Sequence, residues 1–346
     1  MNYSVLSRYR SELMGFAMLW VLIYHTWELQ INNPILNIFR SSGSAGVDIF
    51  ILLSGVGLVA SLCRREQSYE RFMARRAGRI LPAYFITMVP YTLFLIRQGQ
   101  ATVSTLLWNA TLLSTWVNPP GAINWYIPAI MLYYALTPWC LRRLRRSRNR
   151  EWLALAAVAA SILAVQIFLR DGFWSYSGVL YHLPIFFLGL LVGLYVYEEK
   201  KLTLPALLFW AAAMAAGMAY AWAGWAAVPP RFDTTFWPQP YGFLLWTVPL
   251  CLLLCLCFER LPLSGVRAVL RWIGERSLEI YLLNATLFLA VYPYLLPLFT
   301  FRWGGVVYYL LASLLNIALG GALHWALERA GKAWTARRRS MDTAAP

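Results

Sequence analysis

Charged residues are scarce in this sequence, and acidic ones are the scarcest. Only 13% of the 346 residues are charged, with 15 Asp and Glu against 30 Lys and Arg, whereas 60% are hydrophobic. A soluble domain has about 25% charged and about 45–50% apolar residues, so this composition excludes an ordinary soluble domain. The net charge of +15 would suit nucleic acid. However, the basic residues lie between apolar runs rather than on one soluble face, and we expect no nucleic-acid partner.

Cysteine is also sparse, and its five copies follow no zinc or disulfide spacing. We interpret them as packing residues and expect no metal site. The first apolar segment is followed by Glu28 and Gln30 and has no small-residue cleavage site, which indicates a retained span rather than a signal peptide. We find no internal repeat, and this disfavours a transporter built from inverted repeats.

Long apolar runs, by contrast, occupy most of the chain. A span needs about 20 mostly apolar residues, and by that rule we expect ten, at 12–29, 46–63, 80–97, 123–141, 152–170, 179–197, 203–224, 241–258, 278–300 and 304–327. The shorter, more polar segment 101–116 predicts an interfacial or partly inserted helix in a loop. The expected fold is all-α: a polytopic membrane bundle of about ten transmembrane helices, forming one domain over 1–340, with a disordered tail at 341–346.

The distribution of Lys and Arg supports this topology. With the N-terminus inside, the outer segments hold few of the 30 basic residues, and the inner segments hold all the others. The outer ones are Arg40, Arg97, Arg170, Arg231 and Arg302. Because positive residues are retained on the cytoplasmic side, we expect both termini to be cytoplasmic. The predicted location is the cell (cytoplasmic) membrane, with multiple passes.

Polar side chains at membrane depth are costly, so each is a functional candidate. His25 lies thirteen residues after Glu12, which is about 20 Å along a helix, in the outer half of the bilayer. A neutral imidazole there can act as a general base, or it can be a hydrogen-bonded packing residue. Asp48 enters the second span at a similar depth. It can fix the orientation of His25, as in a catalytic triad, or favour the first turn of its own helix.

Further polar groups are expected in the same outer layer. His182 lies near the outer end of the sixth span, and Asn124-Trp125-Tyr126 opens the fourth. His324, near the inner end of the last span, is more simply a packing residue. The arginines from Arg142 to Arg150 favour a topology anchor with affinity for anionic lipid.

An arginine cluster precedes the third span on the inner side. Helical spacing places Arg76 and Arg79 on one face, with Arg75 beside them. A pair of guanidinium groups on one face can grip a phosphate bidentately. The alternative is a positive flank that only fixes the orientation of the helix.

Three motifs occur in order along the first three spans. They are Arg10-x-Glu12-x-x-Gly15 followed by His25, then Gly46-Val47-Asp48-Ile49-Phe50 with Leu53-Ser54-Gly55, and finally Phe72-x-x-Arg75-Arg76-x-x-Arg79-Ile80-x-Pro82-x-Tyr84. Together they resemble the acyltransferase-3 family of integral-membrane acyltransferases, which O-acylate sugars and related molecules. The late segment Ser277 to Asn284 also resembles the family. Many members have His where this chain has Asn284, and many place a Glu shortly after the Trp of the fourth span, which this chain lacks.

The resemblance implies a cytosolic acyl-CoA donor, usually acetyl-CoA, as co-substrate, with no permanently bound cofactor. It implies an acceptor hydroxyl on a carbohydrate or cell-envelope component. The expected catalytic residues are His25 and Asp48, and the expected acyl-CoA-binding residues are Arg75, Arg76 and Arg79. The expected acceptor or support residues are Glu12, Trp125, Tyr126, His182 and Asn284. Membrane lipids are further expected partners. A multi-span carrier or exporter of a glycan or small metabolite, without acyl-transfer chemistry, is the alternative.

Overall fold

The computed structural model describes residues 1–26, 29, 33–64, 67–122, 125–170, 177–226, 239–301 and 303–344. Over these residues the chain forms helices and no β-strand. The α-helices are α1 (Val5–Arg8), α2 (Arg10–Tyr24), α3 (Pro34–Ser41), α4 (Ala45–Arg64), α5 (Tyr69–Arg97), α6 (Val103–Ala110), α7 (Ser114–Val117), α8 (Tyr126–Arg146), α9 (Arg150–Arg170), α10 (Ser177–Tyr197), α11 (Leu204–Ala226), α12 (Gln239–Arg260), α13 (Ser264–Glu275), α14 (Ser277–Leu283), α15 (Leu289–Leu295) and α16 (Gly304–Ala344). A π-helix, Asn284–Phe288, joins α14 to α15, and short 3-10 turns occupy Ser42–Ser44 and Leu296–Leu298.

In the described part of the chain, 7 helices are long and apolar enough to cross a membrane. They are Ile35–Arg64, Tyr69–Arg97, Arg150–Phe168, Gly178–Tyr197, Leu204–Gly224, Tyr241–Arg260 and Gly304–Ala336. This confirms the expected all-α polytopic bundle. The other three predicted spans overlap α2, α8 and the interrupted run from α14 to α15, and α2 ends at Tyr24, before its predicted limit. The total of ten spans and the side of each terminus remain predictions.

Several helix limits differ from those expected. α5 begins at Tyr69, where the Ser68 hydroxyl accepts a hydrogen bond from the Arg71 backbone N–H, so the arginine cluster lies inside the helix. The segment 101–116 is helical as predicted, but Leu112, with φ of 61°, separates α6 from α7. The helix α16 continues to Ala344, four residues into the tail expected to be disordered, and 345–346 lie outside the described residues. The amphipathic α13 was not predicted because its 12 residues are too few to span a bilayer.

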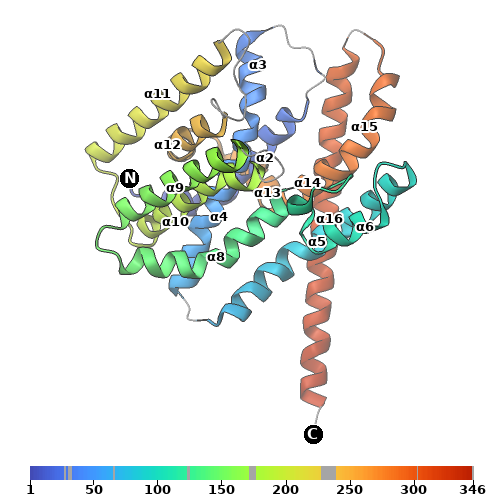
Figure 1. The fold of residues 1–346 in the computed structure, drawn as a ribbon, viewed down its shortest axis with the longest axis horizontal. Coiled ribbons are helices and arrows are strands. Elements are labelled where there is room, and N and C mark those ends of the chain that lie inside the picture. Colours follow the sequence, from blue (N-terminus) through green and yellow to red (C-terminus); the bar gives the residue numbers. More distant parts are fainter. Residues whose placement is uncertain are drawn as a thin grey trace.

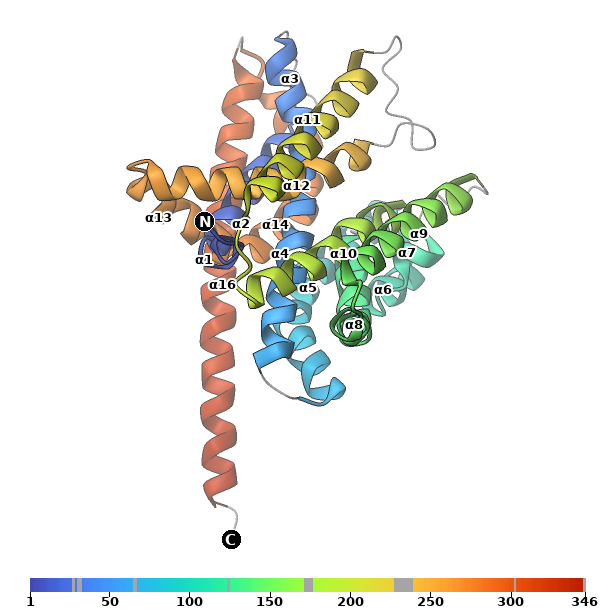
Figure 2. The ribbon, with the colours of Figure 1, turned by 90° about the vertical axis from the view of Figure 1, so that its left-hand side faces the viewer.

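The helix α4 lies in the interior of the bundle and packs against α10, α2, α12 and α8. Its contact with α10 depends on glycine: a Cβ at Gly189 would lie 2.8 Å from the Leu52 carbonyl oxygen, and one at Gly55 would lie 2.9 Å from the Gly189 carbonyl carbon. Gly189 and Gly55 therefore let the backbones of α4 and α10 approach each other closely. Both views show α16 as a long column that reaches beyond the other helices toward the C-terminus (Figures 1 and 2).

The crossing of α2 and α13 is closer still, and it supplies a test of the fold. A Cβ at Gly274 would lie 1.8 Å from the Ser11 carbonyl oxygen and 2.7 Å from the Gly15 nitrogen, which are backbone atoms of α2. Gly274→Ala should therefore force the helices apart and lower the free energy of unfolding by about 3 kcal/mol, measured as thermal stability in detergent. Gly265→Ala, in the same helix with nothing within 4 Å, is the matched control. Equal stability of both variants would contradict the close packing.

Candidate active site

A cavity of 470 Å³ lies where α2, α4, α5, α8, α13, α14 and α16 meet. It is lined by Arg10, Ser11, Met14, Phe50, Ser54, Arg76, Arg79, Ile80, Tyr126, Ile130, Tyr134, Gly274, Glu275, Ser277, Leu278, Tyr281, His324 and Glu328. Two of the three predicted donor-binding arginines, Arg76 and Arg79, therefore reach it. The third, Arg75, is exposed and is not among the lining residues. We call this space the arginine cavity.

Two of the arginines that line the cavity have no carboxylate partner among the described residues. Arg10 donates from Nε to the Leu53 carbonyl oxygen at 3.3 Å. The Arg76 guanidinium lies over the rings of Phe72 and Tyr134, at 5.5 and 5.8 Å. Their positive charges interact unfavourably with each other. Glu275 and Glu328 also line the cavity, but neither forms an ion pair with Arg10 or Arg76. Two like charges that face one cavity without an ion-pair partner favour a bound anion.

Arg10 was not predicted as a binding residue, although it opens the first motif. Its helical spacing to Met14, four residues on, could have indicated that both share the face of α2 toward the cavity. The sequence does not show how α2 and α5 are placed relative to each other. Their packing in the fold brings Arg10 and Arg76 to one cavity, although 66 positions separate them in the chain.

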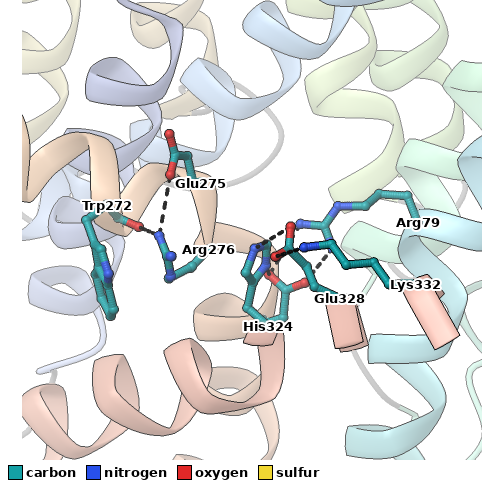
Figure 3. A network of polar contacts seen from close by, with 8 residues as sticks. Arg79, Trp272, Glu275, Arg276, His324, Glu328 and Lys332 are labelled. Carbon is teal, nitrogen blue, oxygen red and sulfur yellow. Dashed lines mark hydrogen bonds and ion pairs between the residues drawn. The ribbon is translucent and has the colours of Figure 1, made fainter. Parts of the chain in front are cut away.

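Arg79 is engaged differently, because it pairs with a carboxylate. Glu279 of α14 is fully buried, and its two oxygens lie 2.5 and 3.4 Å from the Arg79 nitrogens. The Nδ1 atom of His324 lies 3.3 Å from the same carboxylate. Figure 3 shows these groups together with Glu328 of α16, which lies 3.7 Å from His324 Nε2 and 3.9 Å from the Lys332 amine. His324, expected as a packing residue, therefore belongs to a polar network at the cavity, and Glu279 is a member that the sequence analysis missed.

The Arg79–Glu279 pair predicts a large effect on stability. Arg79→Ala should lower the free energy of unfolding by about 3 kcal/mol or more, because it leaves the Glu279 carboxylate buried without its main charge partner. Arg76→Ala, which leaves no carboxylate unpaired, should have a much smaller effect on the melting temperature. Adding Glu279→Gln to Arg79→Ala should restore part of the loss. A stable Arg79→Ala protein would contradict this structural role.

His25 and Asp48 are hydrogen-bonded to different residues. This corrects the predicted pairing, in which Asp48 orients His25. Asp48, 2% exposed, accepts its hydrogen bond from His182, with 2.7 Å between Oδ1 and Nδ1. His25, which follows the last residue of α2, is hydrogen-bonded to Asn284 at the start of the π-helix. The rotation of α4 turns the Asp48 side chain toward α10, the helix with which α4 packs most extensively.

The aromatic pair that opens α8 divides between two environments. Trp125 stacks on the His182 ring, with centroids 4.7 Å apart and planes within 5°, so it supports the Asp48–His182 pair. Tyr126 turns into the arginine cavity and meets Tyr281 edge-on at 5.0 Å. Tyr126 and Trp125 are thus adjacent in sequence but contact different polar groups. Asn124, the first residue of this motif, lies outside the described residues.

Glu12 anchors α13 to α2. It is 1% exposed, and its Oε1 atom lies 2.6 Å from Arg271 Nη2 and 3.9 Å from Arg267 Nε. The hydrogen bond with Glu12 raises the pKa of the Arg271 guanidinium. This places Glu12 in a support position. Over the described ranges, no group of three or more His, Cys, Asp or Glu could hold a metal ion.

The chain is similar to a known protein family and to curated proteins. Residues 13–325 match the acyltransferase-3 profile, described as an acyltransferase domain. A relative named "Regulator of hypoxia-inducible factor 1", from Caenorhabditis elegans, is 25% identical over 47% of this chain and 38% of its own length. "Putative acetyltransferase ORF330", from Acidianus two-tailed virus, is 28% identical over 52% of this chain and 53% of its own length.

The chain thus spans about half or less of the length of these relatives. No solved structure matches. The family profile, however, covers most of the helical bundle and all the residues that line the arginine cavity except Arg10, Ser11 and Glu328. The chain therefore belongs to the acyltransferase-3 family, whose profile here covers a helical bundle with 7 described helices long and apolar enough to cross a membrane.

Proposed function

We propose that this protein moves an acyl group, most simply acetyl, from cytosolic acyl-CoA to a hydroxyl of a carbohydrate or cell-envelope acceptor. One observation carries the proposal. The arginine cavity contains two guanidinium groups, of Arg10 and Arg76, that form no ion pair with a described carboxylate. The cavity extends to Tyr281. Tyr281 lies three residues, about one helical turn, before Asn284, the hydrogen-bond partner of His25. A phosphate-binding region and a candidate base are thus linked by one short stretch of α14.

The donor binds by its phosphates in this proposal. Coenzyme A carries several phosphate charges at one end of a long, flexible pantetheine arm, with the thioester at the other end. Arg10 and Arg76 bind the phosphates, because neither guanidinium forms an ion pair with a described carboxylate. Arg79 contributes its exposed side while it holds Glu279. The arm then runs past Tyr126 and Tyr281 toward His25.

The chemistry at His25 is general-base catalysis. His25 takes the proton of the acceptor hydroxyl as its oxygen attacks the thioester carbonyl carbon. The carbon–sulfur bond then breaks, and the coenzyme A thiolate leaves and recovers the proton from the imidazolium of His25. Asn284 keeps the ring in place by its hydrogen bond, and the π-helix that begins at Asn284 sets the direction of that side chain. Asp48 supports the site indirectly, through His182 and Trp125.

The acceptor class and the membrane come from the family. The name of the viral relative includes the word acetyltransferase, which supports acetyl as the transferred group. The apolar side chains exposed along α9 and α11, among them Trp152, Leu163 and Leu208, fit a lipid environment. We place the protein in the cell membrane, with the arginine cavity on the cytoplasmic side.

The test is transfer of label from acetyl-CoA carrying a radioactive acetyl group. Membrane vesicles that contain the protein are incubated with this donor, and label is measured in the carbohydrate and envelope fractions, with free coenzyme A thiol measured in parallel. Acceptor-dependent release of thiol, with label in the acceptor fraction, is the expected result. Transport of a glycan with no consumption of acetyl-CoA would overturn the proposal in favour of a carrier.

A further inference from the structure

Another cavity, of 890 Å³, lies between α8, α9 and α10 and shares no residue with the arginine cavity. It is lined by Trp139, Cys140, Arg142, Arg143, Leu144, Arg146, Ser147, Leu153, Ala154, Ala156, Ala157, Ala160 and Phe187. We call it the α8–α9 groove. No function proposed above uses it.

Small side chains on α9 leave this space open. The α9 residues that line the groove are four alanines and Leu153, and α9 packs along α10 far more extensively than against α8. Apart from Ser147 and three arginines, the other lining residues are apolar, and Trp139 on α8 is 60% exposed. Such a groove on a helix that crosses the membrane is accessible to a lipid chain.

The end of the groove is positively charged and uncompensated. Arg142, Arg143 and Arg146 line it, and no acidic residue does. Over the described ranges, none of the three forms an ion pair with a carboxylate, whereas Arg150 nearby pairs with both oxygens of Glu198 at 2.5 and 2.6 Å. The chain therefore neutralises one arginine of this run and leaves three facing the groove.

We propose that the α8–α9 groove binds one anionic phospholipid. One of its acyl chains lies against Ala156, Ala157 and Ala160, and its phosphate lies among the three groove arginines. The occupant follows from charge complementarity, because an apolar slot that ends in several guanidinium groups fits a molecule with an apolar tail and an anionic head. Topology anchoring alone explains basic residues at the end of a helix, but not their position along an apolar groove.

A pair of double variants tests the proposal. In Arg142→Gln/Arg146→Gln, two groove arginines are lost. In Arg145→Gln/Arg148→Gln, the same charge is removed from the same run of exposed arginines, but these two do not line the groove. Each full-length protein is equilibrated with phosphatidylglycerol or phosphatidylcholine in detergent, and bound lipid is counted by native mass spectrometry. We expect preferential binding of phosphatidylglycerol, weakened about 30-fold in the groove variant and little changed in the control.

A third variant, Ala157→Trp, fills the groove and leaves every arginine in place. It should also lose the tightly bound phosphatidylglycerol, and thermal stability in detergent shows that the bundle is intact. Equal loss in both arginine variants would overturn the proposal, because attraction would then follow net charge and not the groove. Retention of lipid by the Trp variant, or equal binding of phosphatidylcholine, would also overturn it.

Discussion

Replacing His25 with alanine should abolish acyl transfer while leaving the helical bundle intact. A positioned general base contributes about 100-fold to 10,000-fold to a rate, and Asp48 and His182 are occupied with each other. The hydroxyl of the acceptor would keep its proton, so its oxygen would be a poor nucleophile. The expected result is a fall in kcat of at least about 100-fold at unchanged donor affinity, measured with saturating acetyl-CoA.

Two controls separate chemistry from packing. His25→Gln keeps a side chain that can bond Asn284 but cannot act as the base, so it should be as inactive as His25→Ala. Asn284→Ala removes only the partner of His25 and should retain part of the activity, because it displaces the ring without removing it. A folded His25→Ala protein that still transfers acyl groups at a normal rate would show that His25 is not the base.

The positions of the helices were largely readable in the sequence, because burial in lipid requires long apolar runs. Each predicted span overlaps a helix or, at 278–300, a run of helical segments. The helical spacing of Arg76 and Arg79 was also foreseen, and both reach one cavity. The amphipathic α13 and the interruption between α14 and α15 were not foreseen. The segment α13 is too short and too charged to be recognised as a span, and no sequence signal marks the π-helix at Asn284.

The partners of the polar residues could not be predicted, for a physical reason. The depth of a residue in a span follows from counting along the helix, but the direction of its side chain depends on how the helix is rotated against its neighbours. His25 follows the C-terminal end of α2, and Asp48 lies near the N-terminal end of α4, the next predicted span. The Asp48 side chain nevertheless turns toward His182. Glu279 likewise finds Arg79 across 200 positions of sequence. Both outcomes are set by the packing of α4 with α10 and of α14 with α5 and α16.

Replacing Arg10 and Arg76 together with glutamine should lower the affinity for acyl-CoA by about 100-fold or more. A hydrogen bond to a charged group contributes about 1.5–3 kcal/mol, and each 1.4 kcal/mol is tenfold in affinity, so each single variant should lose about 10-fold. Arg76→Lys should already weaken binding, since a lysine cannot make the bidentate contact. Arg75→Gln, outside the cavity, is the matched control. Calorimetry with acetyl-CoA and purified protein measures the change.

The donor itself supplies a second control. Acetyl-pantetheine carries the thioester without the coenzyme A phosphates, so the Arg10 and Arg76 variants should use it as well as the unaltered protein does. A loss with acetyl-CoA alone would assign the two arginines to the phosphates, independently of any effect on His25. A similar loss with both donors would mean that the substitutions disturb the bundle or the reaction itself. Unchanged binding of acetyl-CoA would leave the arginine pair without a role in donor recognition and would place the phosphates elsewhere.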